Sequence, residues 1–259
     1  MTRPASLVDG TRHERQCGMS DSNGFFDIGG DQGQQNGFGP GFGGNFGHHH
    51  HQQHDHHHHH HHHHICFMAD TGVRIPAGEI AVQDLNIGDL VCTADGRRIP
   101  VRWVGRQTVA GVFCEDRQLP VRVKAGAIGD RAPFRDLLVS PDHALLVDGV
   151  LIEAAALVNG TSILRERNIP AIFTYYHVEV DDHSLIFAEG TPAETFIDNV
   201  DRGRFDNWSE YQALYPEGKT IAEMAYPRAM ACRQVPWLIR ERLVRRGAAL
   251  YGAQIASAA

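Results

Sequence analysis

Short runs of β-forming residues, several of them alternating apolar with polar, recur through the middle of the chain. They lie at residues 80–85, 89–93, 100–104, 120–123, 136–139 and 177–180. Alternation over a few residues is the period of a half-buried strand. Between the runs, Asp95-Gly96, Asp148-Gly149 and Asn159-Gly160 favour tight hairpins. The pattern predicts a compact all-β domain.

The pattern becomes helical after about residue 200. Residues 209–214 and 235–246 have helical periodicity, and Pro236 lies near the start of the second run. Within that run, Val235, Ile239 and Leu243 are spaced to share one face. We therefore expect residues 201–259 to form a short helical C-terminal extension that packs on the β-domain.

The first 65 residues have a different composition. They hold 12 of the 27 glycines and, between His48 and His64, 14 of the 18 histidines, with few branched aliphatic residues. Such a segment cannot offset its ordering entropy by burying apolar surface. The sequence predicts a disordered arm over residues 1–65, with the folded part beginning at Cys66.

Charge and cysteine content argue against several classes of protein. The formal net charge of -7 argues against a general nucleic-acid binder. The five cysteines are odd in number and show no C-x-x-C spacing, which indicates neither a disulfide framework nor a zinc knuckle. The chain has no apolar run of about 18 residues and no signal-peptide core. We expect a cytoplasmic protein, with export by another route left open.

The segment from Arg228 to Arg246 carries six arginines and one glutamate. Such a charge excess is compatible with a membrane surface or a polyanion. We interpret it instead as the solvated face of a docking helix, and expect no membrane contact from it.

Four sequence blocks follow one another in an order that points to a family. They are Cys66–Gly72, Val82–Val91, Val139–Val147 and Tyr176–Gly190. In order and spacing they resemble the successive motifs of a Hint domain, the autoprocessing domain shared by hedgehog proteins and inteins. The similarity covers about residues 66–200, and the tail resembles the extension of a bacterial Hint subfamily. The resemblance implies a Hint β-fold.

The resemblance also implies a reaction. In Hint domains the first-residue thiol attacks the carbonyl of the preceding residue, so Ile65-Cys66 is the expected scissile bond and Cys66 the nucleophile. The family's Thr-x-x-His motif reads Ser140-Pro-Asp-His143 here. We expect His143 to act as general acid, and the Ser140 hydroxyl to orient the scissile amide or its oxyanion.

A second acid or base is expected late in the domain, and several residues compete for the role. The candidates, in order of preference, are His177, His183 and Asp181. On a continuous strand, His177 and Asp181 would share one face.

The sequence at the end of the domain distinguishes full splicing from cleavage alone. Inteins carry a His-Asn pair after the last glycine, but here Gly190 is followed by Thr-Pro-Ala-Glu-Thr-Phe. We therefore expect cleavage without full splicing. The chain would act once, on its own N-terminal segment and without a required cofactor, and water or a small thiol, amine or alcohol would take the acyl group. The branched side chain of Ile65 should make that transfer slow or triggered.

The histidine run supports an alternative function. Its imidazoles are ligands for Zn, Ni, Cu or Co, at His48, His49, His50, His51, His54, His56, His57, His58, His59, His60, His61, His62, His63 and His64. The run resembles an engineered tag, although Gln52, Gln53 and Asp55 interrupt it. The alternative is an inactive Hint scaffold that carries a metal-binding arm.

Overall fold

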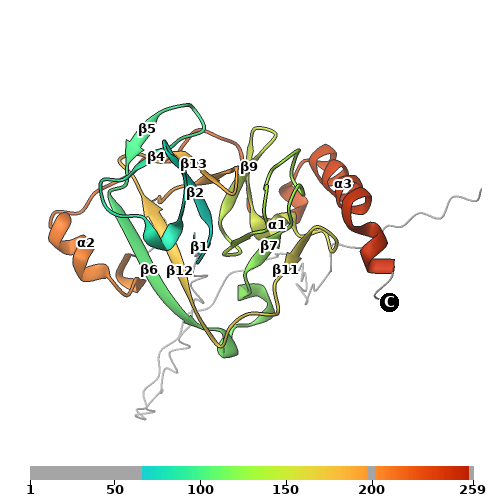
Figure 1. Ribbon diagram of the computed structural model, residues 1–259, viewed down its shortest axis with the longest axis horizontal. Coiled ribbons are helices and arrows are strands. Elements are labelled where there is room, and N and C mark those ends of the chain that lie inside the picture. Colours follow the sequence, from blue (N-terminus) through green and yellow to red (C-terminus); the bar gives the residue numbers. More distant parts are fainter. Residues whose placement is uncertain (1–65, 198–201, 257–259) are drawn as a thin grey trace, which may run out of the picture. The chain divides into compact units, whose positions relative to one another are not determined.

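The structure is a computed structural model that describes residues 66–197 and 202–256 (Figure 1). The predicted disordered arm therefore lies outside the described residues. Within them the chain is mostly β-sheet, with few helices, which confirms the predicted fold class. No helix in the described part of the chain is long and apolar enough to cross a membrane.

The strand that follows Cys66 lies inside a six-stranded antiparallel sheet. The strand order is β11-β7-β8-β1-β12-β6. The strands are β1 (Phe67–Met68), β6 (Trp103–Ala110), β7 (Val121–Val123), β8 (Leu137–Val139), β11 (Ile163–Arg165) and β12 (Ile172–Glu179). The two long strands, β6 and β12, pair along their whole length and form one edge of the sheet (Figure 1).

A second sheet has seven strands in the order β15-β10-β9-β14-β13-β2-β3. They are β2 (Gly72–Ile75), β3 (Gly78–Ala81), β9 (Ala144–Val147), β10 (Val150–Glu153), β13 (Leu185–Ala188), β14 (Thr191–Glu194) and β15 (Arg228–Ala229). A separate hairpin pairs β4 (Leu90–Cys92) with β5 (Arg98–Pro100). A one-turn helix, α1 (Ala154–Leu157), follows β10. Short 3-10 turns cover Val82–Asp84, Gly111–Phe113, Asp116–Gln118, Arg202–Arg204 and Cys232–Gln234.

The local structure at the predicted hairpin turns confirms one prediction and shows that another is wrong. Asp148 and Gly149 both have positive φ (48° and 81°) and join β9 to β10, as a type I′ turn requires. Asn159-Gly160 makes no hairpin, because helix α1 and not a strand precedes it, and the Asn159 side chain accepts backbone N–H groups from residues 161–163. The strand expected at 80–85 ends at Ala81 and continues as a 3-10 turn.

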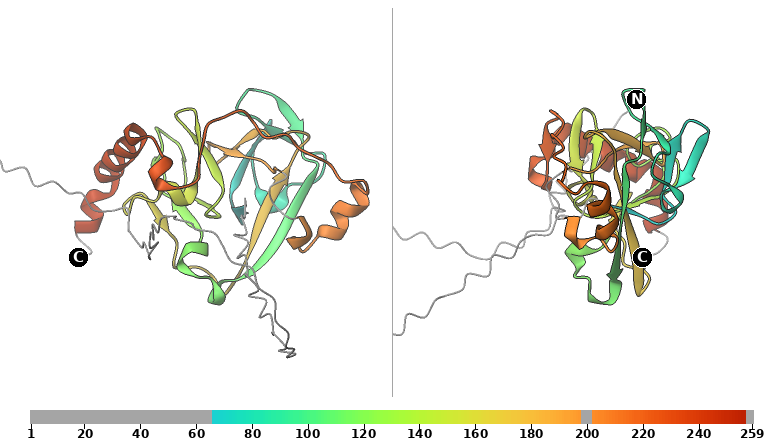
Figure 2. Two further views of the ribbon diagram at one scale, coloured as in Figure 1. Left: turned by 180° about the vertical axis from the view of Figure 1, so that it is seen from behind. Right: turned by 90° about the vertical axis from the view of Figure 1, so that its left-hand side faces the viewer.

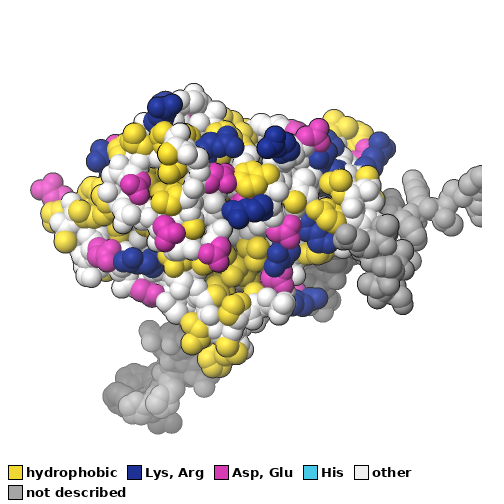
Figure 3. Space-filling view, in the orientation of Figure 1, with side chains coloured by type: hydrophobic (Ala, Val, Ile, Leu, Met, Phe, Trp, Pro, Cys, Tyr) yellow, Lys and Arg dark blue, Asp and Glu magenta, His cyan; other side chains and the backbone are white. Residues whose placement is uncertain are grey.

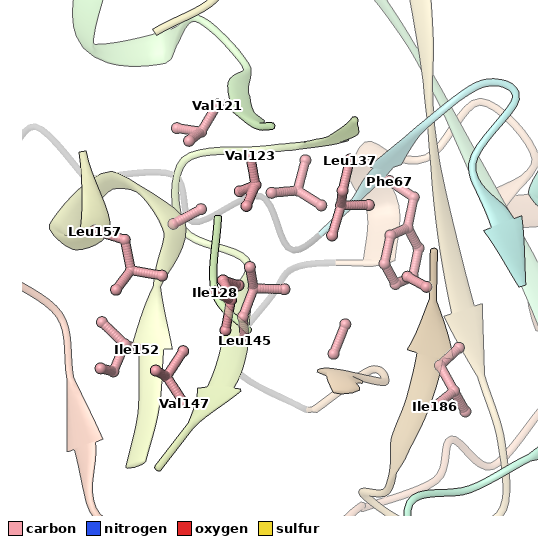
Figure 4. Close-up of a cluster of buried hydrophobic side chains, with 14 of the residues drawn as sticks. Phe67, Val121, Val123, Ile128, Leu137, Leu145, Val147, Ile152, Leu157 and Ile186 are labelled. Atoms are coloured by element: carbon pink, nitrogen blue, oxygen red, sulfur yellow. The ribbon is translucent and has the colours of Figure 1, made fainter. Parts of the chain in front are cut away.

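Strands from both sheets contribute to the main hydrophobic core (Figure 4). Phe67, Val121 and Leu137 come from the six-stranded sheet, and Leu145 and Ile186 from the seven-stranded one; all are buried. Exposed apolar side chains instead gather where β6 ends and β12 begins, at the lower end of the view in Figure 3. The main core therefore begins at Phe67, one residue after Cys66.

The C-terminal extension contains the two predicted helices and one strand that the sequence did not predict. The helices are α2 (Trp208–Leu214) and α3 (Trp237–Ala256), which lie beside different parts of the sheets (Figures 1 and 2). Val235, Ile239 and Leu243 are buried in the main core, as their spacing predicted. Between the helices, β15 pairs in parallel with β10. The extension is therefore built into the seven-stranded sheet.

Candidate active site

The register of β1 brings the predicted nucleophile beside two predicted partners. Strand β1 pairs antiparallel with both β8 and β12, and its register partners for Phe67 are Val139 and Tyr176. One step back along a strand is one step forward along its antiparallel partner. The sheet therefore places Cys66 opposite Ser140 and His177.

Cys66 and Ser140 hold each other by two hydrogen bonds. The backbone N–H of Cys66 donates to Ser140 Oγ at 2.9 Å, and the backbone N–H of Ser140 donates to the Cys66 carbonyl at 2.9 Å. Both residues are fully buried. Because the nitrogen of Cys66 belongs to the predicted scissile amide, the serine hydroxyl contacts that amide directly. Ile65, the other half of the bond, lies outside the described residues.

His177 lies on the thiol side of Cys66. Its Nδ1 is 4.0 Å from Cys66 Sγ, within reach of a sulfur hydrogen bond. The ring packs edge-on against Phe196, with centroids 4.5 Å apart, and Phe205 lies beyond it at 5.5 Å. The imidazole is thus held by strand β12 and by aromatic side chains, in position to take a proton from the thiol.

The thiol itself is poorly ionised. Burial raises the pKa of the Cys66 thiol well above its ordinary value, and the charge of Asp142 adds to this. A neutral thiol is a weak nucleophile, so Cys66 needs a neighbouring base at the moment of attack. His177 is the base that the geometry offers.

His143 contacts β1, the strand that follows Cys66. Its ring packs on Phe67 with centroids 4.3 Å apart, and its Nε2 is 3.1 Å from the backbone carbonyl of Glu194. A carbonyl only accepts, so Nε2 carries the proton and Nδ1 of the neutral ring is an acceptor. Nδ1 is buried and has no hydrogen-bond partner among the described residues.

The electrostatic surroundings of His143 favour the neutral ring. Burial lowers the pKa of His143, while the Glu194 carboxylate and the backbone of Cys66 and Glu194 act in the opposite direction. A protonated His143 is therefore scarce at neutral pH and correspondingly strong as an acid.

The other two candidates for the second acid or base lie elsewhere. The Asp181 side chain is half exposed, because β12 ends at Glu179 and the face-sharing alternation ends with it. Its carboxylate binds Arg102 through two hydrogen bonds of 2.7 Å. His183 is buried, with Nδ1 accepting the Met224 N–H at 2.9 Å. Of the three candidates, the structure brings His177 to within 4.0 Å of Cys66 Sγ.

Comparison with known proteins identifies the family of the chain. A family model described as the Hint domain matches residues 65–200, which is more than half of the chain. The chain belongs to the Hint domain family. A search of curated proteins finds no match.

Solved structures similar to this Hint domain are inteins and intein-like domains. The MchDnaB-1 intein is 17% identical, with a TM-score of 0.36, over 50% of this chain and 99% of that chain. The Msm DnaB1 intein splicing domain bound with zinc is 17% identical, with a TM-score of 0.36, over 49% and 98%. The bacterial intein-like domain from Clostridium thermocellum is 11% identical, with a TM-score of 0.32, over 51% and 98%. The family assignment rests on the family model.

Two polar residues of the Hint domain that sequence reasoning missed lie close to the predicted site. Glu194, whose carbonyl contacts His143, lies in the segment after Gly190, where the intein asparagine is missing. No signal in the sequence identifies Glu194, because residues 191–196 do not alternate apolar with polar residues. Tyr175 precedes His177 by two residues on β12 and shares its face.

Tyr175 lies in the same hydrophobic cluster as Cys66. Its hydroxyl is buried and has no hydrogen-bond partner among the described residues. Burial raises the pKa of Tyr175, and the nearby thiol of Cys66 adds to the effect. The hydroxyl is therefore a neutral donor without an acceptor beside the nucleophile.

No metal centre is found within the described part of this Hint domain. Among residues 66–197 and 202–256, no group of three or more His, Cys, Asp or Glu side chains is arranged to hold an ion. The predicted metal ligands, His48 to His64, lie outside these ranges.

Proposed function

We propose that this Hint domain cleaves its own chain between Ile65 and Cys66 by an N-to-S acyl shift. Membership of the Hint family supports autoprocessing or splicing-type activity in general. The observation that carries the finer proposal is the hydrogen bond from the Cys66 N–H to Ser140 Oγ, because it connects this chain's Ser-x-x-His motif to the nitrogen that must leave.

The first step is attack by the thiol. Cys66 Sγ forms a bond to the carbonyl carbon of Ile65, and His177 Nδ1 takes the thiol proton. The distance of 4.0 Å between these two atoms supports this role for His177. The negative charge then lies on the former carbonyl oxygen of Ile65.

The second step is loss of the nitrogen. The bond between the Ile65 carbonyl carbon and the Cys66 nitrogen breaks, and that nitrogen needs a proton to leave as an amine. His143, protonated at Nδ1, supplies it. The products are a thioester on Cys66 Sγ and a free Cys66 amine. Over both steps, one proton moves from sulfur to nitrogen.

The thioester then loses the arm. Water hydrolyses it, or a small thiol, amine or alcohol takes the acyl group, and residues 1–65 leave with Ile65 as their last residue. The branched Cβ of Ile65 crowds the carbonyl and slows the incoming nucleophile. Because the segment after Gly190 lacks the intein asparagine, the reaction ends at cleavage.

The experiment that tests this proposal follows the intact mass of the purified chain during incubation with dithiothreitol. We expect a fragment that begins at Cys66 from the parent chain and none from Cys66→Ala. Cys92→Ala is the matched control, since Cys92 is also a free cysteine, on β4. Cleavage between residues 65 and 66 in Cys66→Ala would refute the cysteine mechanism. An unchanged parent mass would favour the inactive scaffold with a metal-binding arm.

A further inference from the structure

Glu194 connects the candidate acid of the Hint domain to the C-terminal extension. Its backbone carbonyl lies 3.1 Å from His143 Nε2. Its carboxylate accepts the backbone N–H of Ala144, the residue after His143, at 2.8 Å. One residue of β14 therefore holds both the ring and the backbone at this end of the Ser-x-x-His motif.

The Glu194 carboxylate is fully buried and charged. Burial alone would raise its pKa, but hydrogen bonds from His183 and Arg228 outweigh that effect and lower the pKa of Glu194 to about 2. A buried carboxylate without a partner would be strongly destabilising. The position of Glu194 therefore depends on the cation that faces it.

That cation comes from the extension. Arg228 Nη2 donates to Glu194 Oε2 at 2.6 Å, and Nη1 lies 3.4 Å from Oε1, so the guanidinium faces both carboxylate oxygens. Its Nε donates to Glu223, another extension residue, at 2.8 Å. The two-residue strand β15 pairs with β10 and fixes the backbone of Arg228 opposite Leu151.

A second contact from the extension supports the same carboxylate. His183 Nε2 lies 3.4 Å from Glu194 Oε2. Because His183 Nδ1 accepts the Met224 N–H, its proton is on Nε2, on the side that faces Glu194. The extension thus supplies one direct partner of Glu194 and orients another.

We infer that Arg228 is a positioning residue for His143, acting through Glu194, and that the C-terminal extension thereby completes the acid–base site of the Hint domain. The inference rests on the proposed function for the role of His143. It assigns the extension a part in the cleavage reaction.

A purely structural role and a positioning role differ in their effect on His143. The groups that act on the charge of His143 are the Glu194 carboxylate, Arg228 and the backbone of Cys66 and Glu194, while Asp142, on the same loop, acts on Cys66. Glu153 lies opposite Ala144 on the neighbouring strand, and His183 lies beyond Glu194. The charge of Glu194 raises the pKa of His143, and that of Arg228 lowers it. Removing one or the other must therefore move this pKa in opposite directions.

The test measures His143 directly and cleavage separately. In the full-length Cys66→Ala chain, which stays whole, NMR with labelled histidine follows the titration of the His143 ring, assigned by loss of its signal in His143→Gln. We expect the pKa of His143 to rise in Arg228→Gln and to fall in Glu194→Gln. The surface ion pair between Arg245 and Glu241 provides the control Arg245→Gln, which should leave the titration unchanged.

In the chain that retains Cys66, we expect Arg228→Gln to slow cleavage by about 10- to 100-fold, since small displacements of a catalytic group have effects of this size. Arg245→Gln should cleave at the parent rate. Arg228→Lys keeps the charge but loses the two-pronged geometry. It should leave the pKa of His143 near the parent value and cleave at an intermediate rate. If Arg228→Gln does not fold, Arg228→Lys decides the question by its cleavage rate.

Shifts of His143 in the same direction in Arg228→Gln and Glu194→Gln would overturn the inference. So would an Arg228→Gln or Arg228→Lys chain that cleaves at the parent rate. Failure of the proposed function would appear differently, as a parent chain that does not cleave. In that case the pKa of His143 in the Arg228 and Glu194 variants would still test whether the extension acts on His143.

Discussion

Two buried polar regions meet at His143, and they differ in how their polar groups are paired. On the Cys66 side, His143 Nδ1 and the Tyr175 hydroxyl have no hydrogen-bond partner among the described residues. On the Glu194 side, the carboxylate faces Arg228 and His183 and accepts a backbone N–H. One region has unused hydrogen-bonding capacity beside a nucleophile, and the other is held by charge pairs.

The difference suggests that the two sides of His143 have different roles, one in proton transfer and one in holding the ring. Buried polar groups are normally hydrogen-bonded, and leaving one unpaired costs about 1–3 kcal/mol. Among the described residues Nδ1 of His143 has no hydrogen-bond partner, and in the proposed reaction it is the ring nitrogen that delivers the proton. The paired Glu194 keeps the ring from turning away. We therefore propose the Cys66 region as the reacting centre and the Glu194 region as its support.

The largest predicted effect comes from replacing the residue that the two regions share. His143→Gln keeps a side chain that can donate to the Glu194 carbonyl but removes the acid. Loss of a general acid slows a reaction by about 10²–10⁴-fold. The measurement is the rate of appearance of the Cys66 fragment. His183→Gln is the comparison, and cleavage slowed equally by both variants would contradict a special role for His143.

A smaller effect concerns a second buried carboxyl that contrasts with Glu194. Glu153 has no ion pair among the described residues, and burial together with the charge of Asp142 raises its pKa to about 8. Because this pKa lies above the unfolded value, its contribution to stability is present below about pH 4.5 and is lost as pH rises through 8.

Glu153→Gln should therefore be more stable than the parent at pH 9, by about 1–3 kcal/mol, and should gain little or nothing at pH 4.5. Denaturant unfolding at both pH values, in a Cys66→Ala background, measures this difference. Equal differences at the two pH values would contradict the raised pKa. A lower stability of Glu153→Gln at pH 9 would indicate that this carboxyl has a cationic partner.

The smallest effect concerns the unpaired hydroxyl beside Cys66. Tyr175→Phe removes a buried donor that has no acceptor, so the free energy of unfolding should rise by up to about 1 kcal/mol. Cleavage should stay within about threefold of the parent rate, because proton transfer in the account uses the two histidines. A loss of stability would show that the hydroxyl has a partner, and a tenfold slower cleavage would place it in the reacting centre.

Much of the reacting centre could be predicted from the sequence, because its residues lie in motifs. Cys66 begins the folded part, Ser140 and His143 share one short block, and alternation marks the strand of His177. The type I′ turn at Asp148-Gly149 and the buried face of α3 follow from local rules. Each of these features can be predicted from a few residues that are neighbours in the sequence.

The support region could not be predicted in the same way. Strand β15 is two residues long, too short for any periodicity, and the ion pair joins Glu194 to Arg228 across 34 positions. Nothing in the sequence around Arg228 separates it from the other arginines of the extension. For Asp181 the local prediction failed. The shared face of His177 and Asp181 required a continuous strand, but the strand ends at Glu179.

The most direct test of the central claim is to trap the acyl group. The chain is incubated with hydroxylamine, which cleaves thioesters under conditions that leave amides intact, and the released N-terminal fragment is examined by mass spectrometry. We expect residues 1–65 with a hydroxamate at Ile65, together with a fragment that begins at Cys66, and no cleavage between residues 65 and 66 in Cys66→Ala. An intact parent chain after this treatment, or cleavage between residues 65 and 66 in Cys66→Ala, would contradict this mechanism.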